Sequence, residues 1–106
     1  MYQPAEDSFF FADFLKKYLS KLKNKNISYC DMGAATGILS ETAKSSGVAE
    51  KNILAVDINP EAVKFVKDKG FTAIRSNLFS KVRKKFDLIT FNAPYLPADR
   101  YDAESD

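Results

Sequence analysis

Short apolar runs alternate with segments of helical spacing along this chain, and that alternation restricts the folds open to it. The runs at residues 27–31, 52–57, 71–75 and 86–91 are expected to be strands. Strands that alternate with helices form parallel sheets. The runs are nearly continuous in apolar residues, which is typical of strands covered on both faces. We therefore predict an α/β fold in which helices cover both faces of a parallel sheet.

Three segments are expected to be helices. The first follows Pro4, and its apolar residues keep helical spacing over residues 10–22. The second covers residues 38–46 and the third residues 60–69. Proline is favoured at the first position of a helix, so Pro60 marks the start of the third.

Composition narrows the function without defining it. The 106 residues suffice for one small domain, so we treat residues 1–106 as a single domain. The net charge of +2 is too small to indicate nucleic-acid binding by itself. One cysteine, Cys30, and no histidine exclude an intrachain disulfide, a Cys/His zinc site and histidine-based catalysis. We find no signal peptide or membrane-spanning stretch, and we expect a buried thiol in a reducing, cytoplasmic setting.

Polar or small residues follow each predicted strand, where ligands bind in open α/β sheets. Asp31 ends the first strand and precedes a turn of small residues, 33–37, and Asp57 ends the second strand. Asn77 follows the third strand and Asn92 the fourth. Small residues let a ligand approach the backbone, and the next helix presents free N–H groups. A carboxylate placed like Asp57 suits ribose hydroxyls, so we predict a site for an adenosine-containing ligand.

Each of these features also has a purely structural interpretation. The two aspartates could cap the next helices, the glycines could serve only the turn, and Asn77 could be an ordinary loop residue. Segment 92–97, Asn-Ala-Pro-Tyr-Leu-Pro, could be a rigid exit loop, because proline fixes its own φ and restricts the residue before it. Their order after successive strands favours one shared site. The turn lacks the G-x-G-x-x-G pattern, which argues against NAD or FAD.

Five motifs carry a family resemblance. DMGAATG (31–37), VDINPEAV (56–63), SNLF (76–79) and FNAPYLP (91–97) resemble motifs of class I S-adenosylmethionine-dependent methyltransferases with an N-P-P-Y signature. The opening YQPAEDSFFFADFL (2–15) resembles the eukaryotic and archaeal branch of the HemK-like release-factor glutamine methyltransferases. The resemblance covers nearly the whole chain. It implies a Rossmann-like sheet of order 3-2-1-4-5-7-6, of which this chain has the part 3-2-1-4 and lacks the C-terminal strands.

The resemblance implies S-adenosylmethionine as the cofactor and no metal. Asp31 would lie near its methionine amino group, Asp57 at its ribose, and Asn77 with Leu78 at its adenine. Asn77 replaces the acid usual in the family, and its side-chain oxygen can still accept a hydrogen bond. The remaining residues placed against the cofactor are Ser8, Gly33 and Asn92.

The resemblance also gives segment 92–95 a catalytic role. An amide nitrogen is a poor nucleophile because its lone pair is delocalised, so it must be held in line with the methyl group. The Asn92 side chain and the Ala93 carbonyl would accept its N–H groups, while Tyr95 would stack on the amide and Pro94 would fix the angle. Ala93 replaces the first proline of N-P-P-Y, which keeps the carbonyl and gives up the rigidity of the ring. The implied reaction is N5-methylation of the glutamine in the Gly-Gly-Gln motif of a release factor.

Two other functions stay open. Similar loops serve the amino methylation of adenine or cytosine in nucleic acid, where the base must be flipped into the pocket. Those enzymes need a target-recognition region, and we see none in the sequence. The chain could also be a non-catalytic, cofactor-binding subunit of a split enzyme.

Partners follow from the same resemblance. A sheet that stops after four strands leaves residues 86–91 as an open apolar edge without proline or lysine, which is an aggregation hazard. We expect a second chain to supply the missing strands beside Phe86–Phe91. Eukaryotic and archaeal relatives dock a small zinc-binding activator protein at the edge of the third strand, residues 71–75. The expected substrate is the release factor.

Overall fold

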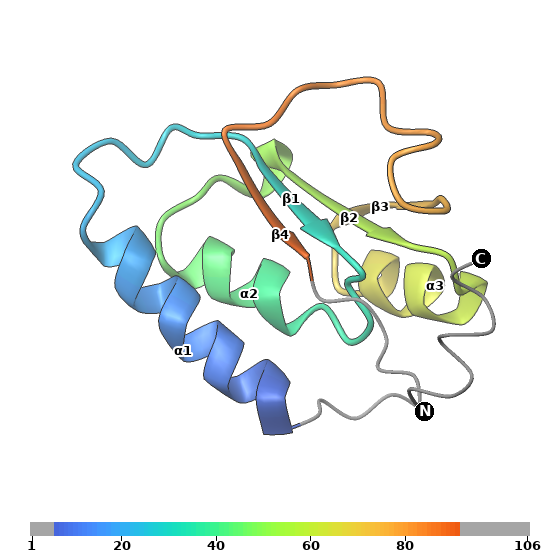
Figure 1. Ribbon diagram of the computed structural model, residues 1–106, viewed down its shortest axis with the longest axis horizontal. Coiled ribbons are helices and arrows are strands. Elements are labelled where there is room, and N and C mark those ends of the chain that lie inside the picture. Colours follow the sequence, from blue (N-terminus) through green and yellow to red (C-terminus); the bar gives the residue numbers. More distant parts are fainter. Residues whose placement is uncertain (1–5, 92–106) are drawn as a thin grey trace, which may run out of the picture.

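The computed structural model describes residues 6–91, so the predicted segment 92–95 lies outside the described residues (Figure 1). The predicted order of helices and strands is confirmed, with small differences at their ends. The helices are α1 (Glu6–Ser20), α2 (Ile38–Ser45) and α3 (Pro60–Asp68), with a 3-10 turn at Glu50–Asn52. The strands are β1 (Tyr29–Met32), β2 (Ile53–Asp57), β3 (Thr72–Arg75) and β4 (Leu88–Phe91).

The fourth strand begins at Leu88, two residues later than Phe86, where we predicted its start. Asp87 explains the difference. Its carboxylate accepts hydrogen bonds from the Ser28 backbone N–H at 2.9 Å and the Ser28 hydroxyl at 3.3 Å. These side-chain bonds hold Asp87 beside Ser28, and regular pairing of β4 with β1 starts at the next residue, Leu88.

The four strands form a parallel sheet in the predicted order, β3-β2-β1-β4. Tyr29 of β1 lies opposite Ile53 of β2 and Leu88 of β4. At the other end of β1, Met32 lies opposite Val56 and Phe91. The carboxyl ends of these strands therefore meet at one edge of the sheet, where the site residues were expected.

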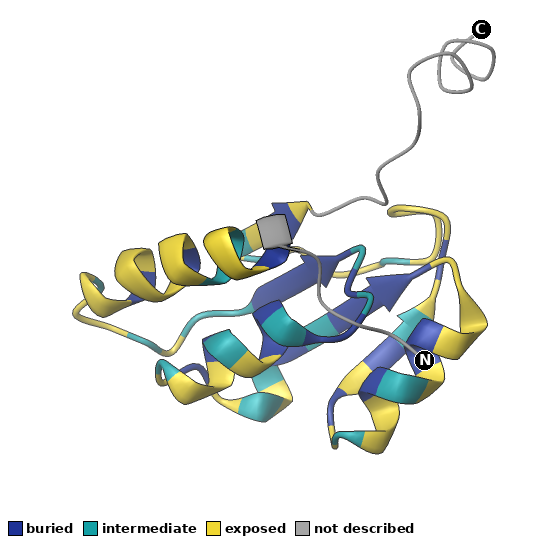
Figure 2. Ribbon diagram, turned by 90° about the horizontal axis from the view of Figure 1, so that it is seen from below, coloured by how far each residue is buried: buried dark blue, intermediate teal, exposed yellow. Residues whose placement is uncertain are grey.

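All three helices cover the same face of the sheet (Figure 2). Successive strand residues point to opposite faces, so Tyr29 points toward the helices and Cys30 away from them. The core on the helical face combines Leu15 and Leu19 of α1, Leu39 and Ala43 of α2, Val63 and Val66 of α3, and Tyr29, Ile53, Ala55 and Ala73 of the sheet.

The opposite face carries no helix among the described residues, which corrects the expectation of helices on both faces. Segment 76–87 crosses it instead, and its Val82 and Phe86 pack on a second cluster of Cys30, Met32 and Val56. The hydroxyl of Ser76 binds backbone groups of this segment and so competes with helical hydrogen bonding. Segment 76–87 thus forms a turn followed by an extended stretch that packs on this face of the sheet.

Two further expectations concern the chain as a whole. Cys30 is buried, as predicted, and burial raises the pKa of its thiol to about 11, with a further rise from the nearby charge of Asp31. The thiol is therefore protonated at neutral pH and unreactive.

None of the helices within residues 6–91 has the length and apolar character needed to cross a membrane.

Candidate functional site

The carboxylate of Asp31 is buried at the carboxyl end of β1, and only one of its two oxygens has a hydrogen-bond partner among the described residues. Ser40 donates to its Oδ2 from the backbone N–H at 3.1 Å and from the hydroxyl at 2.7 Å. Its Oδ1 is buried and has no partner within the part of the chain that the structure describes. Burial raises the pKa of Asp31 to about 6; the bonds from Ser40 oppose this rise and the charge of Asp57 adds to it. A cationic donor at Oδ1 would therefore relieve a costly unpaired acceptor.

The turn after β1 places backbone close to β2 and α3. Gly33 and Gly37 have φ of 77° and 83°, in the left-handed region that favours glycine. The Gly33 amide donates to the Val56 carbonyl at 2.8 Å, which fastens the turn to β2. A Cβ on Gly37 would lie 3.2 Å from a methyl group of Val66, so glycine here also allows α3 to approach. The turn is thus fixed in place and presents small residues at the sheet edge.

Asp57, at the end of β2, links two segments through its carboxylate. Its Oδ2 accepts a hydrogen bond from the Ala35 amide at 2.9 Å, and its Oδ1 accepts one from the Asn59 amide at 2.9 Å. The N-cap of α3 is Asn59, which accepts from the Glu61 amide at 2.9 Å. Asp57 is therefore not the helix cap, and each of its oxygens keeps a lone pair for a further donor.

The turn after β3 is organised by Ser76. Its amide donates to the Asp57 carbonyl at 3.1 Å, and its hydroxyl donates to the Leu78 carbonyl at 2.9 Å. The same hydroxyl accepts from the Lys81 amide at 3.0 Å. Leu78 has a φ of 56°, which is uncommon for a residue other than glycine. The turn therefore holds Asn77 and Leu78 beside Asp57 in a constrained conformation.

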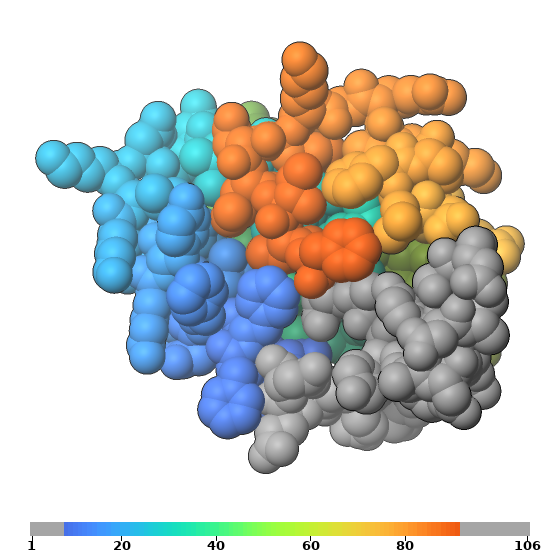
Figure 3. Space-filling view, viewed as in Figure 1, coloured from blue at the N-terminus to red at the C-terminus, as the bar shows by residue number. Residues whose placement is uncertain are grey.

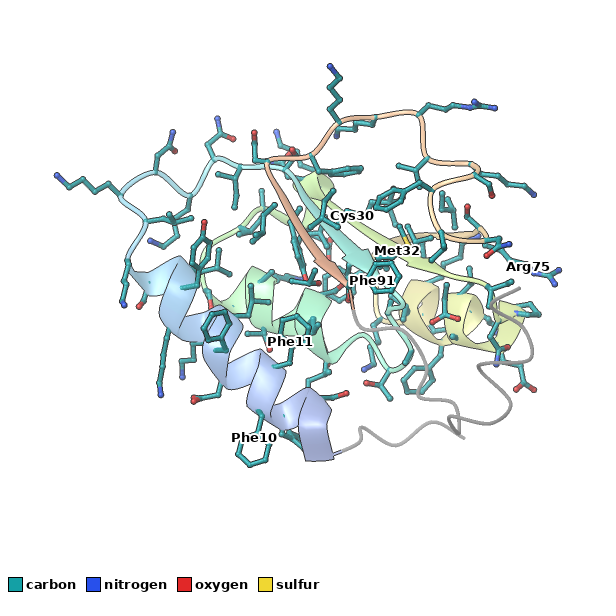
Figure 4. All side chains as sticks on the ribbon, in the orientation of Figure 1. Phe10, Phe11, Cys30, Met32, Arg75 and Phe91 are labelled. Atoms are coloured by element: carbon teal, nitrogen blue, oxygen red, sulfur yellow. The ribbon has the colours of Figure 1, made fainter. Side chains whose placement is uncertain are left out.

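A cleft of about 140 Å³ opens between these segments at the carboxyl edge of the sheet. Four of the predicted cofactor residues line it: Gly33, Asp57, Asn77 and Leu78. The other lining residues are Met32, Ile58, Ser76 and Phe91. Figure 4 shows Phe91 at the end of β4 beside Met32, its partner in the strand register.

Two predicted residues do not line this cleft. Asp31 lies beneath the turn, bound to Ser40, and Ser8 is a buried residue of α1. Asn92, the seventh predicted cofactor residue, lies outside the described residues together with the rest of segment 92–95.

Several residues of the site were missed by the sequence analysis. Ile58 is one of them: its large apolar side chain is 52% exposed at the cleft, beside the predicted Leu78 at 49%, and exposed apolar walls suit a ring. Ser40 could have been noticed as a hydroxyl in the first turn of the helix after Asp31. Lys69 Nζ donates to the Thr36 carbonyl at 2.6 Å and so fastens the turn from α3. No sequence signal marks Lys69. Within the described residues, no three of the side chains that commonly bind metals are grouped closely enough to hold an ion.

The chain is similar in sequence to methyltransferases, two of which are described as glutamine methyltransferases. It is 41% identical over 103 residues to a candidate protein N5-glutamine methyltransferase of Methanocaldococcus jannaschii, covering 92% of this chain and 48% of that protein. It is 33% identical over 81 residues to the release factor glutamine methyltransferase of Fusobacterium nucleatum, covering 68% of this chain and 23% of the relative. It is 28% identical over 106 residues to methyltransferase HEMK2 of Mus musculus, covering 91% of this chain and 49% of that protein. The chain thus spans about half the length of the first and third relatives, and no family model matches it.

Solved structures share the fold. A crystal structure from Thermoplasma acidophilum superposes with a TM-score of 0.67 at 25% identity, over 87% of this chain and 51% of that one. A candidate RNA methyltransferase of Pyrococcus horikoshii superposes with a TM-score of 0.65 at 25% identity, over 80% of this chain and 45% of that one. In both cases the likeness extends over about half of the longer chain.

Proposed function

We propose a function on the premise that this chain belongs to the HemK-like glutamine methyltransferases and contains the N-terminal part of their class I fold. It binds S-adenosylmethionine at the carboxyl edge of the sheet and takes part in methylating a glutamine side chain of a release factor. One observation carries the proposal: Gly33, Asp57 and Asn77 line a single cleft, with the unsatisfied carboxylate of Asp31 beneath it.

The site fits the cofactor group by group. Asp31 Oδ1 is a buried acceptor without a partner among the described residues, and a methionine ammonium is a cationic donor. Asp57 keeps lone pairs for ribose hydroxyls, and Ile58 and Leu78 offer apolar walls to adenine, with Asn77 beside its amino group. The cofactor, when bound, supplies an electrophilic methyl group. The chain's part is to orient it and to exclude water.

The role of holding the substrate's glutamine amide is assigned to segment 92–95, which follows Phe91, a residue of the cleft, in the sequence. In our proposal the Asn92 side chain and the Ala93 carbonyl accept the two N–H groups of the glutamine amide. Tyr95 stacks on the amide plane, and Pro94 limits the directions it can take. Positioning of this kind is worth up to roughly 7–11 kcal/mol of activation barrier in intramolecular reactions. The glutamine is that of a Gly-Gly-Gln motif, and the setting is the cytoplasm.

Amino methylation of nucleic acid is the second candidate, favoured by the fold likeness to the candidate RNA methyltransferase. The higher identity to the M. jannaschii relative favours the protein substrate. A non-catalytic, cofactor-binding subunit is a third. A small zinc-binding activator could serve any of the three by pairing with the open edge of β3, Thr72–Arg75.

The test uses the native assembly of the chain with whatever partner chains accompany it. Radiolabelled S-adenosylmethionine is supplied with a release factor carrying Gly-Gly-Gln, with the same factor carrying Gly-Gly-Ala, and with an RNA. We expect label only on the first protein, while calorimetry shows cofactor binding. Label on the RNA would support the second candidate. Binding without any transfer would support the third.

A further inference from the structure

Ser40, in the first turn of α2, holds Asp31 through two hydrogen bonds to a single oxygen atom. Its hydroxyl donates to Asp31 Oδ2 at 2.7 Å, and its backbone N–H donates to the same atom at 3.1 Å. Because both donors belong to one residue of a helix, they restrict the rotation of the carboxylate. The other oxygen, Oδ1, is buried and has no partner among residues 6–91. The carboxylate thus has one occupied acceptor and one unpaired acceptor.

Capping of α2 explains only part of this arrangement. The N-cap residue of α2, Gly37, gives the helix no side-chain cap. The Asp31 carboxylate accepts one of the first N–H groups of the helix, that of Ser40, and the positive end of the helix dipole favours its negative charge. Capping leaves Oδ1 unexplained, because Asp31 and Ser40 are both 0% exposed and a buried acceptor without a donor is costly. We therefore expect Oδ1 to meet a donor from outside the described residues.

Packing around this pair keeps it away from water. In the sheet, Asp31 lies between Ala55 of β2 and Thr90 of β4. Helix α1 packs on α2, with Leu19 against the same core as Leu39. Figure 3 shows α1, in blue, and β4, in orange to red, at the surface on this side of the molecule. In such a buried site each hydrogen bond affects the ionised carboxylate more strongly than it would in water.

The titratable groups that face Asp31 within the described residues do not stabilise its negative charge. Asp57, at the end of β2, is itself an acid, and its charge raises the pKa of Asp31. Tyr29 and Cys30 of β1 have raised pKa values and are therefore neutral at pH 7. Helix α2 and strand β4 contribute uncharged hydroxyl groups on this side of the sheet. The two bonds from Ser40 lower the pKa of Asp31, against the larger effect of burial.

We propose that Ser40 is a positioning residue of the cofactor site: it fixes Asp31 Oδ2 and so presents Oδ1, ionised and unpaired, to a cationic group of the ligand. The inference rests on the proposed function, in which that group is the ammonium of S-adenosylmethionine. Ser40 acts through Asp31, to which it donates. Without the hydroxyl, the carboxylate keeps a single donor, so protonation of Asp31 competes more strongly with binding of the ligand.

Two alanine variants on α2 separate this role from a general effect on the helix. Ser40→Ala removes the hydroxyl bond to Asp31. Ser45→Ala is the matched control, because it removes an exposed hydroxyl bond on the same helix, from Ser45 to the Thr42 carbonyl at 3.0 Å. NMR titration of the Asp31 carboxyl carbon in the complete chain without ligand should give a pKa about one unit higher in Ser40→Ala and unchanged in Ser45→Ala. Equal pKa values in Ser40→Ala and the wild type would overturn the proposal.

The affinity for S-adenosylmethionine gives the second readout, by calorimetry on the native assembly at pH 6 and pH 8. Ser40→Ala should bind about five- to tenfold more weakly than the wild type at pH 6 and within about twofold at pH 8, where Asp31 is ionised in both proteins. Ser45→Ala should match the wild type at both pH values. An equal loss at pH 6 and pH 8 would show that Ser40 acts only through packing, and would also overturn the proposal. If the wild type binds no S-adenosylmethionine at either pH, the proposed function fails, and the NMR titration still decides whether Ser40 keeps Asp31 ionised.

Discussion

The Asp57 carboxylate accepts a hydrogen bond from the Ala35 amide at 2.9 Å, so one side chain at the end of β2 fixes the turn that follows β1. From the sequence, Asp57 was expected to contact the ribose or to cap the next helix, and its bond to the turn after β1 was not foreseen. Its second bond, from the Asn59 amide, adds the start of α3 to the segments it joins. Any change at Asp57 is therefore expected to alter the shape of the cleft as well as the proposed ribose contact.

We predict that Asp57→Ala weakens S-adenosylmethionine binding by roughly 1.5–3 kcal/mol and also destabilises the chain, because two amides lose a charged acceptor. Asp57→Asn keeps one acceptor oxygen and should lose less stability for a similar loss of affinity. Calorimetry measures affinity and thermal unfolding measures stability. Unchanged affinity in Asp57→Ala would remove Asp57 from the ribose.

Asp31 makes the stability of the unliganded chain depend on pH. Its pKa rises from 3.8 to about 6 on folding, so between these values the folded state binds more protons than the unfolded state. The free energy of unfolding should then fall as pH rises from about 4 to 6, and level off above that range. Asp31→Asn removes this contribution. Denaturant titrations across this pH range measure the free energy of unfolding of both proteins. The value for Asp31→Asn minus the value for the wild type should increase as pH rises from about 4 to 6. A constant difference would contradict the raised pKa.

The same carboxyl group predicts the opposite trend for cofactor affinity. An ammonium group binds the ionised form of Asp31, and below its pKa of about 6 that form becomes scarce. We expect affinity for S-adenosylmethionine to fall by about tenfold per pH unit below 6, because protonation competes with binding. Calorimetry at several pH values measures this slope. Asp31→Asn should bind weakly at every pH, and a wild-type affinity that is flat down to pH 5 would place the ammonium elsewhere.

The fold was predictable because its signals are local and repeated. Apolar runs and the Asn59-Pro60 helix start indicated parallel strands and helices, and the strand order came from the family resemblance. The expectation that helices cover both faces of the sheet was wrong for the described residues. The reason lies in Ser76, whose hydroxyl bonds three positions of the following segment and favours a turn, an interaction that hydrophobic spacing cannot reveal.

The sequence indicated which strand-end residues would lie at one edge of the sheet, and it did not indicate the hydrogen bonds that connect them. Asp31, Asp57 and Asn77 were singled out because polar residues at the ends of apolar runs are conspicuous. The bonds from Ser40 to Asp31 and from Lys69 to Thr36 join residues that meet only after folding. Lys69 is 33 residues from its partner, and no spacing rule links the two.

Asn92 should affect turnover more than cofactor affinity. If its side chain orients the substrate amide, Asn92→Ala should nearly abolish methylation of a Gly-Gly-Gln release factor, while binding of S-adenosylmethionine changes far less. The two quantities are measured on the same preparation of the native assembly, one by methyl transfer and the other by calorimetry. A wild-type rate in Asn92→Ala would show that the amide is positioned by other groups.

The last prediction concerns a buried hydrogen bond that sets the position of β4. The Tyr29 hydroxyl and the Thr90 hydroxyl lie 2.6 Å apart, and both side chains are buried. Thr90→Val leaves the tyrosine hydroxyl without its partner, which should cost about 1–3 kcal/mol of unfolding free energy. Tyr29→Phe in the Thr90→Val background removes the orphaned group, so the double variant should be more stable than Thr90→Val alone. Denaturant titration of the four proteins measures the coupling free energy. If the two substitutions act additively, this bond does not hold β4 against β1.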